Sequence, residues 1–317
     1  KYQKWKSYLK GFFDTYSRDV KIMVTGSARM DIYRRGGDSL MGRYFPYRVH
    51  PLTVAELLHQ EVPPLPRITR EPSRLGDNEW DALWQHGGYP EPFVTHDPLF
   101  TRRWNDLRLQ QLTRVEVRDL TGIHDLSQME VLSEILTERS GQQLIYNNLT
   151  ELVTVSANTL RRWVETFGRL YLGFLLRPWF VNISRSLRKE PKWYLRNWSG
   201  IEDPGMRWET LVACHLLKAV EGWTDLGYGD FKLGYLRDKE QHEVDFLVVR
   251  DRKPWFLVEA KTSETALSPA LAYFQKKTRA PFAFQVVRDA DYVQADCFAR
   301  PRGPLVVPAR TLLAQLL

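Results

Sequence analysis

Residues 243–261, EVDFLVVRDRKPWFLVEAK, decide the fold of this chain. The runs 243–250 and 255–261 predict two strands, and the four residues between them predict the turn of a hairpin. In each run, apolar side chains occupy both alternating sets of positions. Strands of this kind are buried on both faces. The stretch therefore predicts the centre of an α/β domain whose sheet is covered on both sides.

Three ionisable side chains interrupt these apolar runs, namely Asp245, Glu259 and Lys261. Their burial is costly unless they are paired or bind a metal. Glu259 and Lys261 are two residues apart, so they share a face of the strand. If Asp245 lies opposite Glu259, their Cβ atoms are about 5 Å apart, and two carboxylates at that separation can hold Mg²⁺. A lysine beside them can hold the attacking water or neutralise charge during metal-assisted phosphodiester hydrolysis. The alternative is a buried ion triad in which Lys261 pairs with both carboxylates.

The segments around this hairpin complete an α/β domain. Helical spacing of apolar residues predicts a helix over 208–220, with Glu209 near its start, and another over 271–277. Further strands are predicted over 231–236, 282–287 and 305–307. The order of Glu209 on a helix, Asp245 on a strand and Glu259-Ala260-Lys261 on the next strand resembles the core of PD-(D/E)xK nucleases.

This resemblance implies a restriction-endonuclease-like α/β domain over residues 186–317. It implies that Asp245 and Glu259 are catalytic metal ligands, that Glu209 is an accessory ligand of Mg²⁺ or Mn²⁺, and that Lys261 is the catalytic lysine. The implied activity is Mg²⁺-dependent cleavage of DNA. Such cores also occur as inactive scaffolds, so a nucleic-acid- or protein-binding ATPase without nuclease activity is the alternative.

The middle of the chain, residues 127–185, predicts a winged helix-turn-helix. Two short helical segments are followed by a third helix that Ser156 can cap and by a strand-like run at 171–179. The third helix of such a motif places its first residues in the major groove of DNA. The candidate DNA contacts are Asn158, Thr159, Arg161 and Arg162. A packing module that binds no DNA is the alternative.

Residues 1–60 begin with an amphipathic aromatic helix. The apolar run 20–25 predicts a buried strand that ends in Gly26-Ser27, and residues 44–49 predict a second strand. Thr53 can cap a short helix. These segments, with KIMVTGS and MGRYFPYRVHPLTVAEL, resemble the second half of the AAA-type ATPase module of a prokaryotic group that carries a C-terminal domain of unknown function.

That resemblance implies that Thr25 and Ser27 sense the γ-phosphate of ATP and that Arg43 reaches a phosphate in a neighbouring subunit of a homo-oligomer. A guanidinium there would neutralise charge on the transferred phosphoryl group. The sequence contains no G-x-x-x-x-G-K-[ST] loop. We therefore expect a truncated module in a piece of a longer protein, with ATP bound only by the complete module and no ATP hydrolysis by this chain alone.

Composition and charge limit the remaining possibilities. Hydrophobic residues make up 43% and charged residues 26% of the 317 residues, which excludes a wholly disordered chain. Two cysteines form no disulfide framework, so we expect a cytoplasmic protein, and no apolar run is long enough to span a membrane. The net charge of +7 is concentrated in residues 1–60 and 156–196, which favours a nucleic-acid partner such as DNA.

We therefore predict an α/β multi-domain protein with four parts. They are a partial P-loop ATPase α/β module over 1–60, a linker and helical segment over 61–126, a winged helix-turn-helix over 127–185 and the nuclease-like domain over 186–317.

Overall fold

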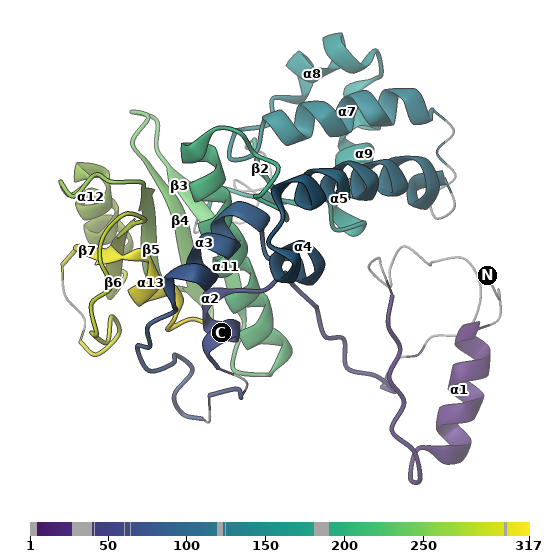
Figure 1. Ribbon diagram of the computed structural model, residues 1–317, viewed down its shortest axis with the longest axis horizontal. Coiled ribbons are helices and arrows are strands. Elements are labelled where there is room, and N and C mark those ends of the chain that lie inside the picture. Colours follow the sequence, from purple (N-terminus) through teal and green to yellow (C-terminus); the bar gives the residue numbers. More distant parts are fainter. Residues whose placement is uncertain are drawn as a thin grey trace.

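The protein has a mixed α/β fold, as predicted (Figure 1). The computed structural model describes residues 5–26, 40, 42–59, 61–63, 65–118, 123, 125–180, 190–300 and 303–317. Its largest sheet has the strand order β3-β4-β5-β6-β7. Strand β4 is antiparallel to both of its neighbours, β3 and β5, whereas β5, β6 and β7 are parallel. The strand bounds are β3 Phe231–Arg237, β4 Glu243–Arg250, β5 Lys253–Lys261, β6 Phe282–Val287 and β7 Leu305–Pro308.

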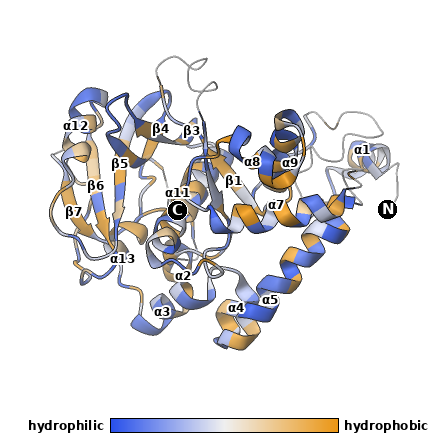
Figure 2. Cartoon of the chain, turned by 90° about the horizontal axis from the view of Figure 1, so that it is seen from above, coloured by the Kyte–Doolittle hydropathy of each residue, from blue (hydrophilic) through white to orange (hydrophobic). Residues whose placement is uncertain are grey.

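Helices cover both faces of this sheet, as the apolar runs predict. Helix α11 (Pro204–Asp225) packs on one face against Phe246 and Val258. Helix α12 (Pro269–Thr278) packs on the other face, where Leu247 and Leu257 belong to a second hydrophobic cluster. Hydrophobic residues are accordingly dense on β5, β6 and β7 (Figure 2). Helix α13 (Ala309–Leu313) follows β7.

The middle of the chain contains three helices followed by a two-stranded antiparallel sheet. The predicted cap of the third helix is confirmed, because the Ser156 hydroxyl accepts a hydrogen bond from the Thr159 N–H at 3.2 Å. The apolar face of that helix is buried, which satisfies its amphipathic pattern. These elements are α7 Leu126–Glu138, α8 Tyr146–Val153, α9 Ala157–Arg169, β1 Gly173–Leu176 and β2 Lys192–Leu195.

A helical segment precedes these elements along the chain. Its helices are interrupted at Gly87-Gly88, and Gly88 contacts the segment that precedes α2. The Leu52 N–H donates to the Gly88 carbonyl at 2.6 Å. A Cβ atom on Gly88 would lie 2.5 Å from the Leu52 carbonyl oxygen, so only glycine allows this approach. The elements are α2 Val54–Leu58, α3 Asp77–His86, α4 Pro90–Thr95, α5 Pro98–Gln111 and the π-helix η2 Leu112–Glu116.

The amino-terminal part differs from the prediction. Helix α1 (Trp5–Tyr16) forms as expected, but it has no buried residue and lies apart from the sheet (Figure 1). Residues 20–25 and 44–49 are not strands, so both strand predictions are wrong. Within the described residues neither segment has a strand to pair with, and Met23 and Phe45 remain exposed. Thr53 caps α2 as predicted.

Candidate functional site

The ionisable residues of the hairpin lie where β4 and β5 begin to separate. The last ladder pair at this end is Phe246 with Val258, so the regular pairing ends just before Asp245 and Glu259, where β4 also has a register shift against β3. The Asp245 carboxylate turns toward β5, where its Oδ2 atom accepts a hydrogen bond from the Ala260 N–H at 2.9 Å. A carboxylate therefore takes up a backbone donor at the point where the two strands diverge.

Helix α11 brings Glu209 to the same place, where a lysine links it to the sheet. The Nζ atom of Lys192 lies 3.2 Å from Glu209 Oε1, 2.7 Å from Glu243 Oε1 and 3.8 Å from Asp245 Oδ1. The side chain of Lys192 is only 6% exposed. Tyr194 donates its hydroxyl hydrogen to Glu209 Oε1 at 2.6 Å. A single buried ammonium group thus contacts carboxylates from α11 and β4.

The second lysine, Lys261, pairs with one carboxylate. Its Nζ atom lies 3.0 Å from Glu259 Oε1. The other oxygen of Glu259, Oε2, is buried and accepts no hydrogen bond within the part of the chain that the structure describes. A buried carboxylate oxygen without a donor is costly. This oxygen is the one atom of the cluster that a cation would satisfy best.

The pKa values reflect the crowding of these carboxylates. Burial, followed by the nearby charges of Glu209 and Glu259, raises the pKa of Asp245 well above its usual range. Burial also raises the pKa of Glu259, although the ion pair with Lys261 opposes the shift. Burial acts against the charge of Lys192, but the surrounding carboxylates outweigh it and raise the pKa of this lysine.

The cluster carries more acidic groups than basic ones. Arg237 pairs with Glu243 at 3.0 Å and supplies the third cation beside the two lysines. Four carboxyl groups therefore face three cations, and this excess of negative charge adds to burial in raising the pKa of Asp245. The carboxyl groups are Glu209, Glu243, Asp245 and Glu259.

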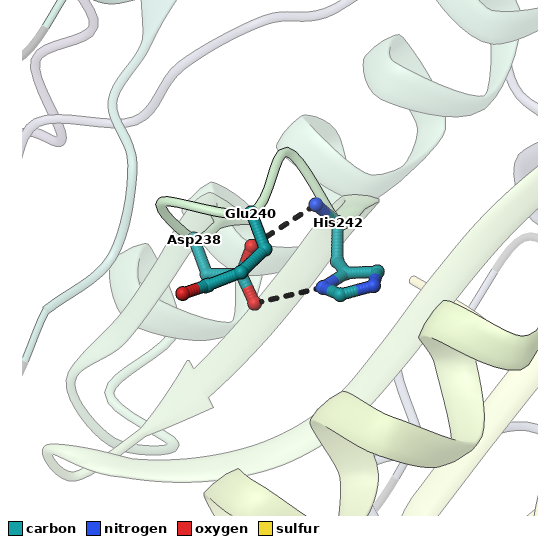
Figure 3. Close-up of side chains that lie close together, drawn as sticks. All are labelled: Asp238, Glu240 and His242. Carbon is teal, nitrogen blue, oxygen red and sulfur yellow. Dashed lines mark hydrogen bonds and ion pairs between the residues drawn. The ribbon is translucent and has the colours of Figure 1, made fainter.

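The structure brings the four nuclease-like residues predicted from the sequence into one cluster, but loosely. Among the described residues, Glu209, Asp245 and Glu259 do not place ligand atoms within 4.8 Å of one another as a set. The group that does is Asp238, Glu240 and His242 in the turn between β3 and β4 (Figure 3). There, His242 Nδ1 lies 3.1 Å from Asp238 Oδ2, and Glu240 and His242 are exposed. These contacts close a surface turn.

Sequence reasoning missed Lys192, Glu243 and Tyr194. Lys192 begins an otherwise apolar strand, and Glu243 is the first residue of β4. A charged residue at the start of an apolar strand is a signal that could have identified both. Their role depends on the contact between β2 and α11, which the local sequence pattern does not reveal.

The predicted DNA contacts lie at the start of α9. Asn158, Arg161 and Arg162 are exposed there, and Thr159 is half-buried. The Arg161 guanidinium lies 4.9 Å from the centre of the Tyr146 ring, which holds it over the surface of α8.

Of the three residues predicted to contact nucleotide, Thr25 and Arg43 lie within the described residues. Thr25 is exposed, and Ser27 lies outside the described residues. Arg43 donates from Nε to Asp14 Oδ1 of α1 at 2.7 Å. Asp14 and Arg43 are both partly exposed, so solvent screens this pair.

None of the helices in the described ranges has both the length and the hydrophobicity that crossing a bilayer requires.

Three family models match separate parts of the chain. Residues 1–58 match the AAA domain, residues 77–200 match a domain of unknown function (DUF8612), and residues 204–298 match another (DUF4143). No solved structure matches the chain.

The curated relatives are themselves uncharacterized. Proteins of Mycobacterium tuberculosis and Mycobacterium bovis are each 23% identical over 267 residues, which cover 80% of this chain and 55% of each relative. A protein of Haemophilus influenzae is 20% identical over 196 residues, which cover 60% of this chain and 47% of that protein. The chain thus spans about half the length of the curated relatives it matches. Its amino-terminal end is similar to the AAA domain, and the match to DUF4143 runs from α11 past β6 of the main sheet.

Proposed function

We propose that the chain is part of an AAA-type ATPase whose C-terminal domain cleaves phosphodiester bonds of DNA with the help of Mg²⁺ or Mn²⁺. The observation that supports the nuclease activity best is the crowded carboxylate cluster of Asp245 and Glu259. Glu259 Oε2 is buried without a hydrogen-bond donor in the described part of the chain, and burial together with the neighbouring carboxylates raises the pKa of Asp245. A divalent cation would give Glu259 Oε2 a partner and would offset the negative charge around Asp245.

The donor set fits a hard cation. Glu209, Asp245 and Glu259 offer only carboxylate oxygens, which Mg²⁺ and Mn²⁺ prefer. The four carboxyl groups exceed the three cations of the cluster, so an added cation meets an unbalanced negative charge. When bound, the metal would lower the pKa of a water molecule and polarise the phosphodiester.

The protein's own residues position the reacting groups. The Ala260 N–H orients the Asp245 carboxylate, and the Tyr194 hydroxyl orients Glu209. Lys261 is close to Glu259, and its positive charge can hold an attacking water and offset the charge that develops on the phosphate.

DNA would be held in part by α9. Its first turn exposes Asn158, Arg161 and Arg162, which suit contacts with phosphates and base edges. Three helices followed by a two-stranded sheet follow the order of elements in a winged helix-turn-helix, which supports this role for α9. In the complete ATPase, Arg43 would serve the nucleotide of a neighbouring subunit.

A second candidate function is a DNA- or protein-binding ATPase whose nuclease-like domain is an inactive scaffold. The observation that favours it is Lys192, whose ammonium group already contacts Glu209, Glu243 and Asp245. A buried lysine in this place can neutralise the carboxylates without a metal.

Cleavage of plasmid and single-stranded DNA with Mn²⁺ separates the two functions. The nuclease proposal predicts activity that Asp245→Ala and Lys261→Ala abolish and that Lys232→Ala, an exposed lysine on β3, retains. Absence of cleavage by the wild type, together with no binding of Mn²⁺, supports the scaffold. Cleavage that survives both Asp245→Ala and Lys261→Ala contradicts the proposed site.

A further inference from the structure

Two arginines share one tryptophan ring near the carboxylate cluster. The guanidinium carbon of Arg207, in the first turn of α11, lies 5.2 Å from the centre of the Trp84 ring on α3. The guanidinium carbon of Arg288, which directly follows β6, lies 4.4 Å from the same ring. Helices α3 and α11 are held together here by Trp80 and Trp208, whose ring centres are 6.2 Å apart. The arrangement is therefore built on three packed elements.

These two positive charges are poorly neutralised. Within the described ranges no carboxylate forms an ion pair with Arg207, and its Nε–H donates to the Ile201 carbonyl at 2.6 Å. Burial, followed by the charge of Arg288, lowers the pKa of Arg207. Arg288 has one acidic partner, the adjacent Asp289, at 2.7 Å from its Nε atom. Like charges held against one indole favour an anion between them.

The pair lies at the edge of the sheet that also carries Lys261. The backbone N–H of Arg288 donates to the backbone carbonyl of Lys261 at 3.0 Å, so the two residues are backbone neighbours at the ends of β6 and β5. Both strands end here, and ligands of α/β sheets bind outside the carboxyl ends of their strands. Arg288 follows Val287, the register partner of Lys261, and therefore lies directly beyond the carboxyl end of β6.

We propose that Arg207 and Arg288, aligned by Trp84, bind a phosphate of a DNA backbone beside the carboxylate cluster. The planar guanidinium fork suits the paired oxygens of a phosphate, and the indole fixes the orientation of both forks. This inference rests on the proposed function, because it names the contact that would hold the strand next to the hydrolytic site. It adds a second DNA contact to that of α9.

Fluorescence anisotropy with labelled single-stranded and duplex DNA in EDTA tests the inference without any cleavage. The double variant Arg207→Gln/Arg288→Gln is expected to bind about tenfold more weakly. The slope of log K against log salt is expected to fall by about one, because one phosphate contact is lost. The matched control is Arg250→Gln, since Arg250 also stacks on aromatic rings, 5.5 Å from Phe231 and 5.9 Å from Trp255. The control is expected to bind like the wild type.

Further arms distinguish the other outcomes. Arg207→Lys/Arg288→Lys keeps the charges but loses the forks, so it is expected to bind with an affinity between those of the Gln variant and the wild type, even if the Gln variant unfolds. DNA affinity that is equal in the wild type and the Lys variant overturns the inference. Stabilisation of the wild type by inorganic phosphate, with DNA binding that ignores both arginines, assigns the site to free phosphate and also overturns it. Asp245→Asn that still binds DNA through these arginines but fails to cleave it separates this site from the nuclease proposal.

Discussion

Lys192 on β2 and Glu209 on α11 form an ion pair of 3.2 Å that joins the middle of the chain to the helix of the main sheet. Both elements belong to the nuclease-like domain predicted over residues 186–317, and one hydrophobic core includes residues from both, Trp193 and Trp208 among them. The domain boundaries placed by the sequence stay predictions. The lysine explains why a cluster of carboxylates is tolerated in the metal-free protein.

Replacing Lys192 tests how far its charge stabilises the folded protein against the repulsion between the buried carboxylates. Lys192→Met leaves buried carboxylates without their cation, and we expect the free energy of unfolding to fall by about 3 kcal/mol. Mn²⁺ should restore part of the loss if the carboxylates bind metal. Chemical denaturation measures both effects. Lys232→Met is the control because Lys232 is 65% exposed in its pair with Asp230, and a similar loss there would contradict the account.

Replacing Asp245 is expected to change the free energy of unfolding in the opposite direction. Asp245→Asn keeps an oxygen for the Ala260 N–H and removes a charge whose burial and repulsion by Glu209 and Glu259 raise the pKa of this carboxyl. We expect the metal-free variant to be as stable as the wild type or more stable by about 1 kcal/mol. Cleavage of DNA with Mn²⁺ should fall roughly 100-fold or more. Thermal unfolding and a nicking assay measure the two quantities, and a variant that is clearly less stable would show that the ionised Asp245 holds the fold together.

The stability of the fold should depend on pH through His215. Burial lowers the pKa of His215 to about 4, and its ring accepts from the Val54 N–H at 3.2 Å. The unfolded chain takes up a proton near pH 6.5, whereas the folded protein resists protonation until about pH 4. Stability conferred by this group is therefore complete above pH 6.5 and is lost as the pH falls toward 4, by about 3 kcal/mol.

Denaturation at several pH values checks this slope. His215→Gln can still accept from Val54 and donate to Leu211, so it keeps the hydrogen bonds without the titration. The variant should lack this part of the pH dependence. Identical slopes in the variant and the wild type would assign the pH dependence to other groups.

Replacing Arg43 is expected to affect ATP hydrolysis without affecting the stability of the fold. Its ion pair with Asp14 is exposed, so Arg43→Ala should leave the unfolding transition unchanged. In the full-length protein the same change should lower ATPase activity about 1,000-fold, because an arginine that reaches the nucleotide of a neighbour stabilises the transferred phosphoryl group. Full ATPase activity of the variant in a steady-state assay would remove Arg43 from the nucleotide site.

The DNA contacts of α9 are tested by their dependence on salt. Arg161→Ala/Arg162→Ala should weaken duplex binding at every salt concentration and reduce the salt slope by about two, since two phosphate contacts are lost. The control is Arg252→Ala in the β4–β5 turn, an exposed arginine on another part of the surface. An unchanged slope in the α9 variant would show that this helix does not touch DNA.

Much of the C-terminal domain could be predicted because its signals are local. The apolar pattern identified β4 and β5, but their register beside Asp245 depends on a shift between Val248 and Val249 that the pattern does not reveal. The role of Lys192 could not be predicted, because it depends on how β2 docks against α11. The segment 20–25 reads as a buried strand, but a strand forms only beside a partner, and within the described residues it has none.

Binding of Mn²⁺, followed by electron paramagnetic resonance on the intact chain, tests the central claim most directly. The account predicts one site per chain that Asp245→Asn/Glu259→Gln abolishes and that Asp238→Asn, in the exposed group of the β3–β4 turn, leaves intact. Binding that is lost with Asp238→Asn and kept in the double variant would contradict it, as would a wild-type protein that binds no Mn²⁺.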